Sequence, residues 1–152
     1  MRFWRICRRR YAADAASGEG ARLFGGRWNS RGVRVVYAST SLALAALETF
    51  VNLEPNLRPA DLVFIEGEIP DAVKIGRVDP KILPARWHET REGSLRRFGD
   101  DWIRDGKSAV LLVPSAAIRG EWNLLLNPAH SDFPIIEFRD PRPFEFDVRM
   151  FR

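Results

Sequence analysis

The chain is poor in the residues that stabilise small secreted or metal-binding folds. Its single cysteine, Cys7, excludes an internal disulfide and favours a reducing compartment. The two histidines, His88 and His130, stand apart from each other and from Cys7, so no ligand pair has the spacing of a zinc site. We therefore expect a fold without disulfides and without a bound metal.

Long apolar runs are also missing. None approaches the roughly 20 residues that a helix needs to cross a bilayer. The basic N-terminal residues, which include Arg8, Arg9 and Arg10, are not followed by the apolar stretch of a secretory signal. These absences predict a cytoplasmic protein that makes no contact with a membrane.

Lysine is scarce, because only three of the 24 basic residues are lysines and the other 21 are arginines. Arginine presents a planar fork of donors that matches phosphate and carboxylate groups. The formal net charge is +4, which permits an anionic partner. Codon bias accounts for an arginine excess as well as a function does, so the composition leaves the partner open.

The chain has 152 residues, 45% of them hydrophobic and 29% charged, which is the balance of a soluble globular protein. This length predicts one compact domain over residues 1–152. Apolar runs bounded by turn residues predict strands, and apolar spacings of three and four predict helices. The expected strands are 3–7, 33–38, 62–69 and 108–113, with a final pair at 134–138 and 144–150.

Two helices complete this pattern. The first begins at the capping residues 39–41, ends near Leu53 and carries an apolar stripe of Leu44, Leu47 and Val51. The second covers 92–104, with Leu95, Phe98 and Trp102 along one side. Residues 12–32 are predicted to form a long loop or a helix fragment, and 70–84 a series of turns. The sum is an α+β fold, which identifies no function by itself.

The densest group of unusual residues spans 25–29, Gly-Gly-Arg-Trp-Asn. Paired glycines let a backbone approach a ligand, and Arg27 and Asn29 offer directional donors. The alternative is a tight turn with Trp28 buried in the core. Neither a Walker motif nor a GxGxxG pattern is present, so this is not a standard phosphate loop.

Three further residues are candidates for a site. Tyr37 ends a predicted strand, and Glu48 follows it on a mostly apolar helix, where a carboxylate either faces solvent or is held by a partner. Ser115 leaves a buried strand, where its hydroxyl binds a ligand or caps the next turn. A hydrolase built from Ser115, His130 and Asp132 is disfavoured, because the serine lacks the GxSxG elbow.

Taken together, these motifs resemble the RES domain family in both order and spacing. The resemblance extends over nearly the whole chain. The matching segments are 4–6, 20–21, 25–29, 36–39, 44–48, 109–115, 123–130 and 143–149. One departure is Asn52, where many members carry a histidine.

The resemblance implies a fold like that of the ADP-ribosyltransferases and the function of a bacterial toxin. RES proteins are toxins of type II toxin–antitoxin pairs, and a separate Xre-type helix-turn-helix antitoxin controls them. A homodimer of the toxin within that complex is compatible with the resemblance, and nucleic acid would be contacted only through the antitoxin. Members consume NAD, as glycohydrolases or phosphorylases, or transfer ADP-ribose to a host protein.

The resemblance also assigns residues. The arginine, glutamate and serine of the family name correspond to Arg27, Glu48 and Ser115, and roles are implied for Tyr37 and Arg5. We expect Arg27, Tyr37 and Glu48 to be catalytic. The NAD-binding residues expected are Arg5, Arg27, Asn29, Tyr37 and Ser115.

This assignment agrees with the chemistry of NAD cleavage. Breaking the bond between nicotinamide and ribose passes through an oxocarbenium-like transition state, as glycoside cleavage does. Nicotinamide leaves from a cation, so no strong general acid is needed and a single glutamate can suffice. A basic RNA-binding or RNA-cleaving toxin and a non-enzymatic binding module are the alternatives, although no nucleic-acid motif is present.

Overall fold

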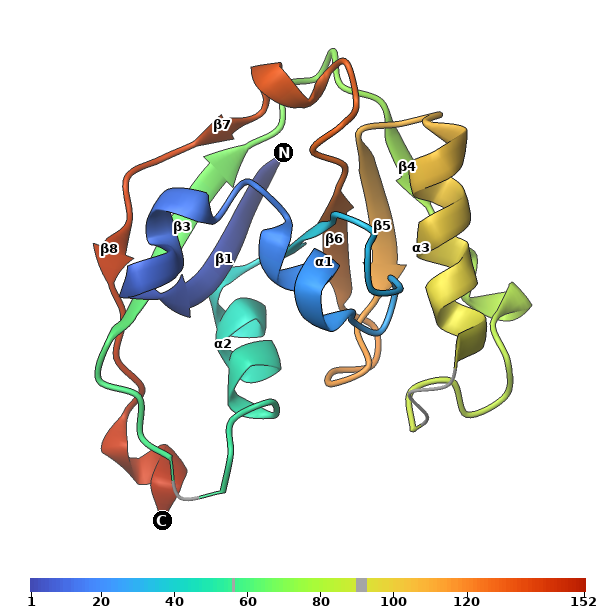
Figure 1. Cartoon of the computed structure of the whole chain (residues 1–152). Helices are drawn as coiled ribbons and strands as arrows, with labels where there is room; N and C mark the ends of the chain where they lie inside the picture. Colours follow the sequence, from blue (N-terminus) through green and yellow to red (C-terminus); the bar gives the residue numbers. More distant parts are fainter. Residues whose placement is uncertain (56, 90–92) are drawn as a thin grey trace.

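The computed structural model describes residues 1–55, 57–89 and 93–152, and the strands within these ranges form one mixed sheet (Figure 1). The strand order is β4-β5-β6-β2-β1-β3-β7, and β8 also pairs with β3. The β4–β5 pair is parallel, and the other pairs are antiparallel. The bounds are β1 Arg2–Arg8, β2 Val36–Ser39, β3 Leu62–Glu68, β4 Ile75–Arg77, β5 Val110–Pro114, β6 Trp122–Leu126, β7 Glu137–Phe138 and β8 Arg142–Pro143.

Three α-helices and four short 3-10 helices accompany the sheet in the described ranges. In Figure 1, α1 lies in front of the centre of the sheet, α2 lies below it and α3 lies along the β4 side. The α-helices are α1 Glu19–Phe24, α2 Leu42–Phe50 and α3 Gly93–Asp105, and the 3-10 helices are η1 Arg9–Asp14, η2 Pro80–Ile82, η3 Phe133–Ile135 and η4 Val148–Phe151. The α+β class and the single domain predicted from the sequence are confirmed.

The central strands are buried on both faces. Leu124 and Leu126 of β6 belong to one apolar core, whereas Leu125 between them belongs to the other. Val110 and Leu111 of β5 are divided between the two cores in the same way. A strand covered on both sides reads as a continuous apolar run, which explains the sequence of this segment.

Helix α3 covers the second core, as its apolar spacing predicts. Leu95 and Trp102 are buried, and Phe98 packs beside them. The helix also approaches the segment before β2 closely, because a Cβ on Gly99 would lie 1.7 Å from the carbonyl oxygen of Trp28. Trp28 itself is buried, as the alternative interpretation of this segment, a tight turn with its tryptophan in the core, required.

Helix α2 begins at a capping serine. The Ser41 hydroxyl accepts a hydrogen bond of 3.1 Å from the N–H of Leu44, which satisfies one of the free donors of the first turn. Leu44 is buried, but Val51 is 58% exposed, so the predicted stripe is wrong at its last residue. The reason is that the helix ends at Phe50, before the stripe can return to the core.

Several boundaries differ from the sequence prediction. The segment 70–84 contains the short strand β4, the strand expected at 33–38 begins only at Val36, and β6 was not predicted. The expected final pair is wrong, because β7 and β8 are two-residue strands that both pair with β3. Residues 148–151 form η4 instead of a strand, since Phe146 and Phe151 pack on Phe50 of α2.

No helix in the described part of the chain is long and apolar enough to cross a membrane.

Candidate functional site

A cleft of about 960 Å³ lies where β1, β2, α2 and the segment before β2 meet. Its lining includes Arg5 of β1, Arg27 of the glycine-rich segment, Tyr37 of β2 and Glu48 of α2. These four residues are distant in the sequence, and all were expected to form the site. The fold therefore brings the central group of predicted residues together around one opening of the size of a ligand pocket.

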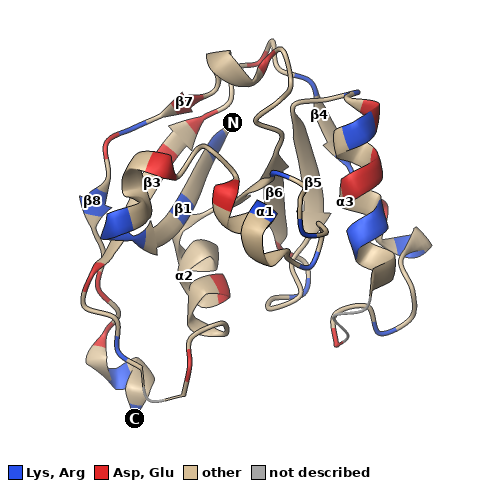
Figure 2. Cartoon of the chain, viewed as in Figure 1, with Lys and Arg blue, Asp and Glu red and all other residues tan. Residues whose placement is uncertain are grey.

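The lining of this cleft is strongly basic. Among the described lining residues, the arginines are Arg5, Arg8, Arg27 and Arg96, whereas Glu48 is the single carboxylate. Glu48 is the one charged residue of α2, and this helix carries a single red band in Figure 2. An opening with this charge distribution favours an anionic ligand, and the forked donors of arginine suit its phosphate groups.

The carboxylate of Glu48 is held in place by two donors. Its Oε1 atom accepts a hydrogen bond of 2.6 Å from the Ser115 hydroxyl and one of 2.5 Å from the Asn123 side-chain amide. Ser115 directly follows β5, and Asn123 lies on β6. Of the two interpretations left open by the sequence, solvent exposure or capture by a partner, the structure has the second.

Ser115 has one of the two roles considered for it, the turn cap, and it also contacts Glu48. Its buried hydroxyl accepts hydrogen bonds from the N–H groups of Ala117 at 3.2 Å and Ile118 at 3.0 Å, so it caps the turn after β5. The same hydroxyl donates a hydrogen bond to Oε1 of Glu48. The Ser115–His130–Asp132 arrangement is not formed, since the His130 ring instead lies against the carbonyl of Gly106.

Tyr37 lines the cleft, and its hydroxyl is engaged in two hydrogen bonds. The hydroxyl donates to Oδ1 of Asn29 at 2.7 Å and accepts from the N–H of Trp28 at 3.1 Å. Burial raises the pKa of the Tyr37 phenol well above its usual range, which favours the neutral form. The ring is therefore the part of Tyr37 that is available to a ligand.

Asn29 organises the glycine-rich segment from within. Its side chain is fully buried, and its amide donates to the carbonyls of Ala21, Ser30 and Val33 at 2.9, 3.1 and 3.0 Å. Asn29 does not line the cleft but supports Tyr37, which does. Gly26 completes this packing, because a Cβ there would lie 2.5 Å from the Tyr37 hydroxyl.

Arg5 and Arg27 approach the cleft from different elements. The Arg5 guanidinium donates to the carbonyl of Tyr37 at 2.8 Å, and that of Arg27 donates to the carbonyl of Trp87 at 3.1 Å. The Nε atom of Arg5 is buried and has no hydrogen-bond partner in the described part of the chain. Burial also lowers the pKa of Arg5, because it disfavours the charged guanidinium. An anion bound in the cleft would offset this cost by pairing with the buried charge.

Sequence reasoning gave no role to several polar residues of this cleft, among them Arg96 and Asn123. Arg96 of α3 lines the cleft and donates to the carbonyl of Gly26 at 3.2 Å. Asn123 lines it as well and contacts Glu48 directly. The available signal for Asn123 was a polar side chain immediately before the buried run of β6.

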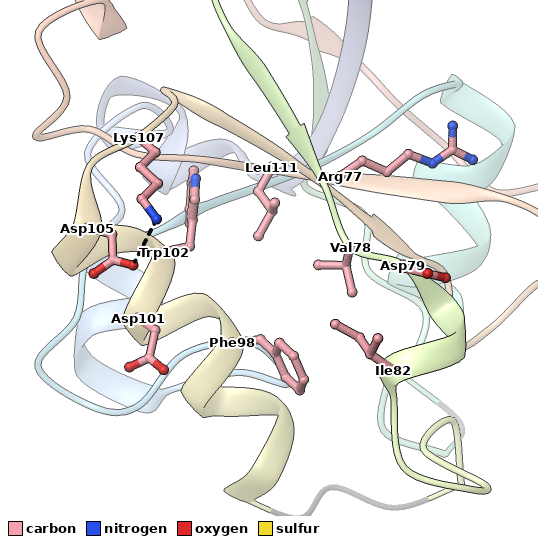
Figure 3. A pocket seen from close by; sticks show the side chains of 10 residues that line it. All are labelled: Arg77, Val78, Asp79, Ile82, Phe98, Asp101, Trp102, Asp105, Lys107 and Leu111. Carbon is pink, nitrogen blue, oxygen red and sulfur yellow. Dashed lines mark ion pairs between the residues drawn. The ribbon is translucent and has the colours of Figure 1, made fainter.

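A second hollow of about 400 Å³ lies between α3 and β4 (Figure 3). Phe98, Val78 and Ile82 give it an apolar floor, and Asp105 and Lys107 form an ion pair of 3.9 Å at its rim. None of the predicted site residues lines it. Among the described residues, no group of three His, Cys, Asp or Glu side chains could hold a metal ion. The larger cleft is therefore the candidate site.

Comparisons with known proteins agree with the resemblance in the sequence. The RES domain family matches residues 2–147. "Prs ADP-ribosylating toxin" of Sphingobium sp. is 43% identical over 155 residues, which cover 99% of this chain and 96% of that protein. "Toxin Res" of Yersinia enterocolitica is 35% identical over 152 residues and 99% of both chains.

A solved structure shares the fold. A chain of the M. tuberculosis MbcT–MbcA toxin–antitoxin complex superposes with a TM-score of 0.70, over 95% of this chain and 84% of that one, at 20% identity. The family match over residues 2–147, together with relatives that are 43% and 35% identical over nearly the whole chain, shows that the chain belongs to the RES domain family.

Proposed function

We propose that this protein is the toxin of a bacterial type II toxin–antitoxin pair and that it consumes NAD by cleaving the bond between nicotinamide and ribose. The observation that carries the proposal is Glu48, a single carboxylate held by two donors in a cleft lined by four arginines. The names of the relatives, which include a toxin that ADP-ribosylates, support the same chemistry.

The reaction requires little from the protein beyond orientation and charge. The bond between C1′ of the ribose and N1 of nicotinamide breaks, and its electron pair neutralises the pyridinium nitrogen. A nucleophile then forms a bond to C1′ and loses its proton to solvent. Because positive charge develops on the ribose, a carboxylate at the position of Glu48 stabilises the transition state.

The arginines would hold the other end of the substrate. Arg27 and Arg5 bind the pyrophosphate, whose two charges match two guanidinium forks. The ring of Tyr37 packs against the nicotinamide or its ribose. Ser115 and Asn29 act on the substrate indirectly. Ser115 holds Glu48 by a hydrogen bond, and Asn29 holds Tyr37 in the same way.

The acceptor is water or inorganic phosphate in the first form of this proposal, which makes the protein a glycohydrolase or a phosphorylase. Transfer of ADP-ribose to a protein is the second candidate, favoured by the 43% identity to a protein named for ADP-ribosylating Prs. Incubation with labelled NAD and Prs would separate the two, since transfer labels the protein whereas hydrolysis and phosphorolysis release soluble ADP-ribose or its phosphate ester.

The test of the proposal uses the purified protein with NAD, with and without phosphate, and separately with RNA. We expect nicotinamide release and intact RNA. Glu48→Gln keeps the acceptor oxygen for Ser115 and Asn123, so it should fold and bind NAD while turnover falls by at least about a hundredfold. Glu54→Gln, an exposed residue after α2, is the matched control and should keep full activity.

Two outcomes would contradict this assignment. Undiminished turnover by Glu48→Gln would remove the glutamate from the chemistry. RNA cleavage without nicotinamide release would favour the ribonuclease alternative. An enzyme that depletes NAD harms its own cell, so we also propose a separate cytoplasmic Xre-type antitoxin as its partner, consistent with the toxin–antitoxin complex that shares the fold.

A further inference from the structure

Three polar residues from three different segments meet beside the Glu48 carboxylate. Ser39 ends β2 and lies opposite Asn123 in the β2–β6 register. The Ser39 hydroxyl donates to Oδ1 of Asn123 at 2.7 Å, and the Asn123 amide donates to Oε1 of Glu48 at 2.5 Å. Ser115 approaches the same oxygen from the end of β5.

The chemistry of these groups permits one arrangement. An ionised carboxylate only accepts hydrogen bonds, so Asn123 must turn its NH₂ group toward Glu48 and its oxygen toward Ser39. The buried Ser39 hydroxyl must then be a donor. On the other side, two backbone N–H groups occupy the lone pairs of the Ser115 hydroxyl and leave its proton for Glu48.

Both donors therefore converge on a single oxygen. Oε1 of Glu48 receives two hydrogen bonds, whereas Oε2 receives none from the described residues. A carboxylate fixed in this way keeps one oxygen available in the cleft. Its orientation is set before a substrate arrives, which is the condition under which a charged group contributes most to a transition state.

We propose that Asn123, oriented by Ser39, is a positioning residue that holds Glu48 by Oε1 and reserves Oε2 for the ribose of the substrate. The inference rests on the proposed NAD cleavage. A packing role alone does not account for Asn123, since an apolar residue before the leucines of β6 would avoid the cost of desolvating a polar pair of which Ser39 is buried and Asn123 half-buried.

The test compares Asn123→Asp and Asn123→Ala with the wild-type protein. The aspartate keeps the size of the side chain and the acceptor for Ser39, but it replaces the donor to Glu48 with a second carboxylate. We expect kcat to fall by about a hundredfold for Asn123→Asp and by about tenfold for Asn123→Ala, because misplacement of a reacting group has costs of this order. KM for NAD should change less than threefold.

Ser39→Ala tests the next link. It should lower kcat in the wild-type background and have little further effect when combined with Asn123→Ala, since coupled residues are non-additive. Asn127→Ala is the control for burial, because Asn127 is a buried asparagine just after β6 with no contact to Glu48. This variant should lose stability and keep its kcat.

The outcomes separate this inference from the proposed function. If the wild-type protein releases nicotinamide and folded Asn123→Asp has the same kcat, the positioning role is wrong and the NAD chemistry stands. A rise in KM with unchanged kcat would also overturn it, because it would make Asn123 a binding residue. If the wild-type protein releases no nicotinamide, the proposed function itself fails.

Discussion

The hydroxyl of Tyr37 donates its proton to Oδ1 of the buried Asn29 at 2.7 Å. The hydroxyl oxygen of Tyr37 also accepts a hydrogen bond from the N–H of Trp28. A phenol engaged on both sides, with its pKa raised by burial, is unsuited to proton transfer near neutral pH. In the proposed reaction, Tyr37 would therefore act through its ring.

This relationship predicts different effects for two substitutions of Tyr37. Tyr37→Phe keeps the ring and should retain NAD turnover within about threefold, but it leaves Asn29 without its donor and should lower the free energy of unfolding by about 1–3 kcal/mol. Tyr37→Ala should abolish turnover. Urea unfolding together with steady-state kinetics would check both. Loss of turnover in a folded Tyr37→Phe protein would instead implicate the hydroxyl in the chemistry.

A larger side chain at Gly26 is expected to displace the same tyrosine by steric contact. A Cβ at this position would lie 2.5 Å from the Tyr37 hydroxyl and 2.8 Å from Oδ1 of Asn29. Gly26→Ala should therefore displace the ring, weaken NAD binding and destabilise the protein by about 1–3 kcal/mol.

Gly20→Ala is the stability control for Gly26→Ala. A Cβ on Gly20 meets no atom within 4 Å in helix α1, so alanine there should raise the melting temperature slightly. Calorimetry would compare the melting temperatures of the two variants with that of the wild-type protein. Equal stability of Gly26→Ala and the wild-type protein would mean that the close packing of Gly26 on Tyr37 is unimportant.

The sequence predicted those elements whose buried face can be recognised from the spacing of residues within the element itself. The spacing of Leu95, Phe98 and Trp102 describes the buried face of α3 because a helix repeats its contacts every three or four residues. The alternation of Phe144 and Phe146 misled, because their partners are not in a neighbouring strand. Phe146 packs on Phe50, nearly a hundred residues earlier, and no local pattern contains that contact.

The same distinction holds for the site. Family resemblance indicated Arg5, Arg27, Tyr37 and Glu48, and these four line one cleft. Asn123 was not predicted, because its importance comes from the strand register that places it opposite Ser39 and beside Glu48. The secondary roles of Ser115 and Asn29 were hidden for the same reason, since their partners lie on other segments.

Substitution of a cleft arginine is expected to lower the affinity of the protein for NAD. Arg27→Ala should raise the Kd for NAD about tenfold or more and slow turnover, because a charged hydrogen-bond donor to the pyrophosphate is lost. Arg27→Lys should recover the affinity only in part, since the ammonium lacks the planar fork. Titration calorimetry with NAD would measure both constants.

Arg97→Ala is the matched control for the cleft arginines. Arg97 is exposed and does not line the cleft, although its neighbour Arg96 does. Arg97→Ala should bind NAD like the wild-type protein. If Arg97→Ala and Arg27→Ala weakened binding equally, general positive charge and not a specific contact would explain the affinity.

The ion pairs of Glu66 on β3 are expected to make the stability of the folded protein depend on pH. Its buried carboxylate accepts hydrogen bonds from Arg2 at 2.6 Å, Arg139 at 3.0 Å and Arg142 at 3.2 Å. The hydrogen bond from Arg2 and the charges of all three arginines hold the pKa of Glu66 below its usual value near 4.5. Because the folded state favours the ionised form, Glu66 stabilises the protein above pH 4.5, and this contribution is lost as the pH falls through the lowered pKa.

Glu66→Gln should therefore be less stable than the wild-type protein at pH 7 and should lose less stability between pH 5 and pH 3. Urea midpoints across this range would measure the difference. Glu145→Gln, at an exposed position, should follow the wild-type curve. Parallel curves for Glu66→Gln and the wild-type protein would mean that Arg2 and Arg142 stabilise the sheet through their packing on Trp4 and Phe64, independently of the charge of Glu66.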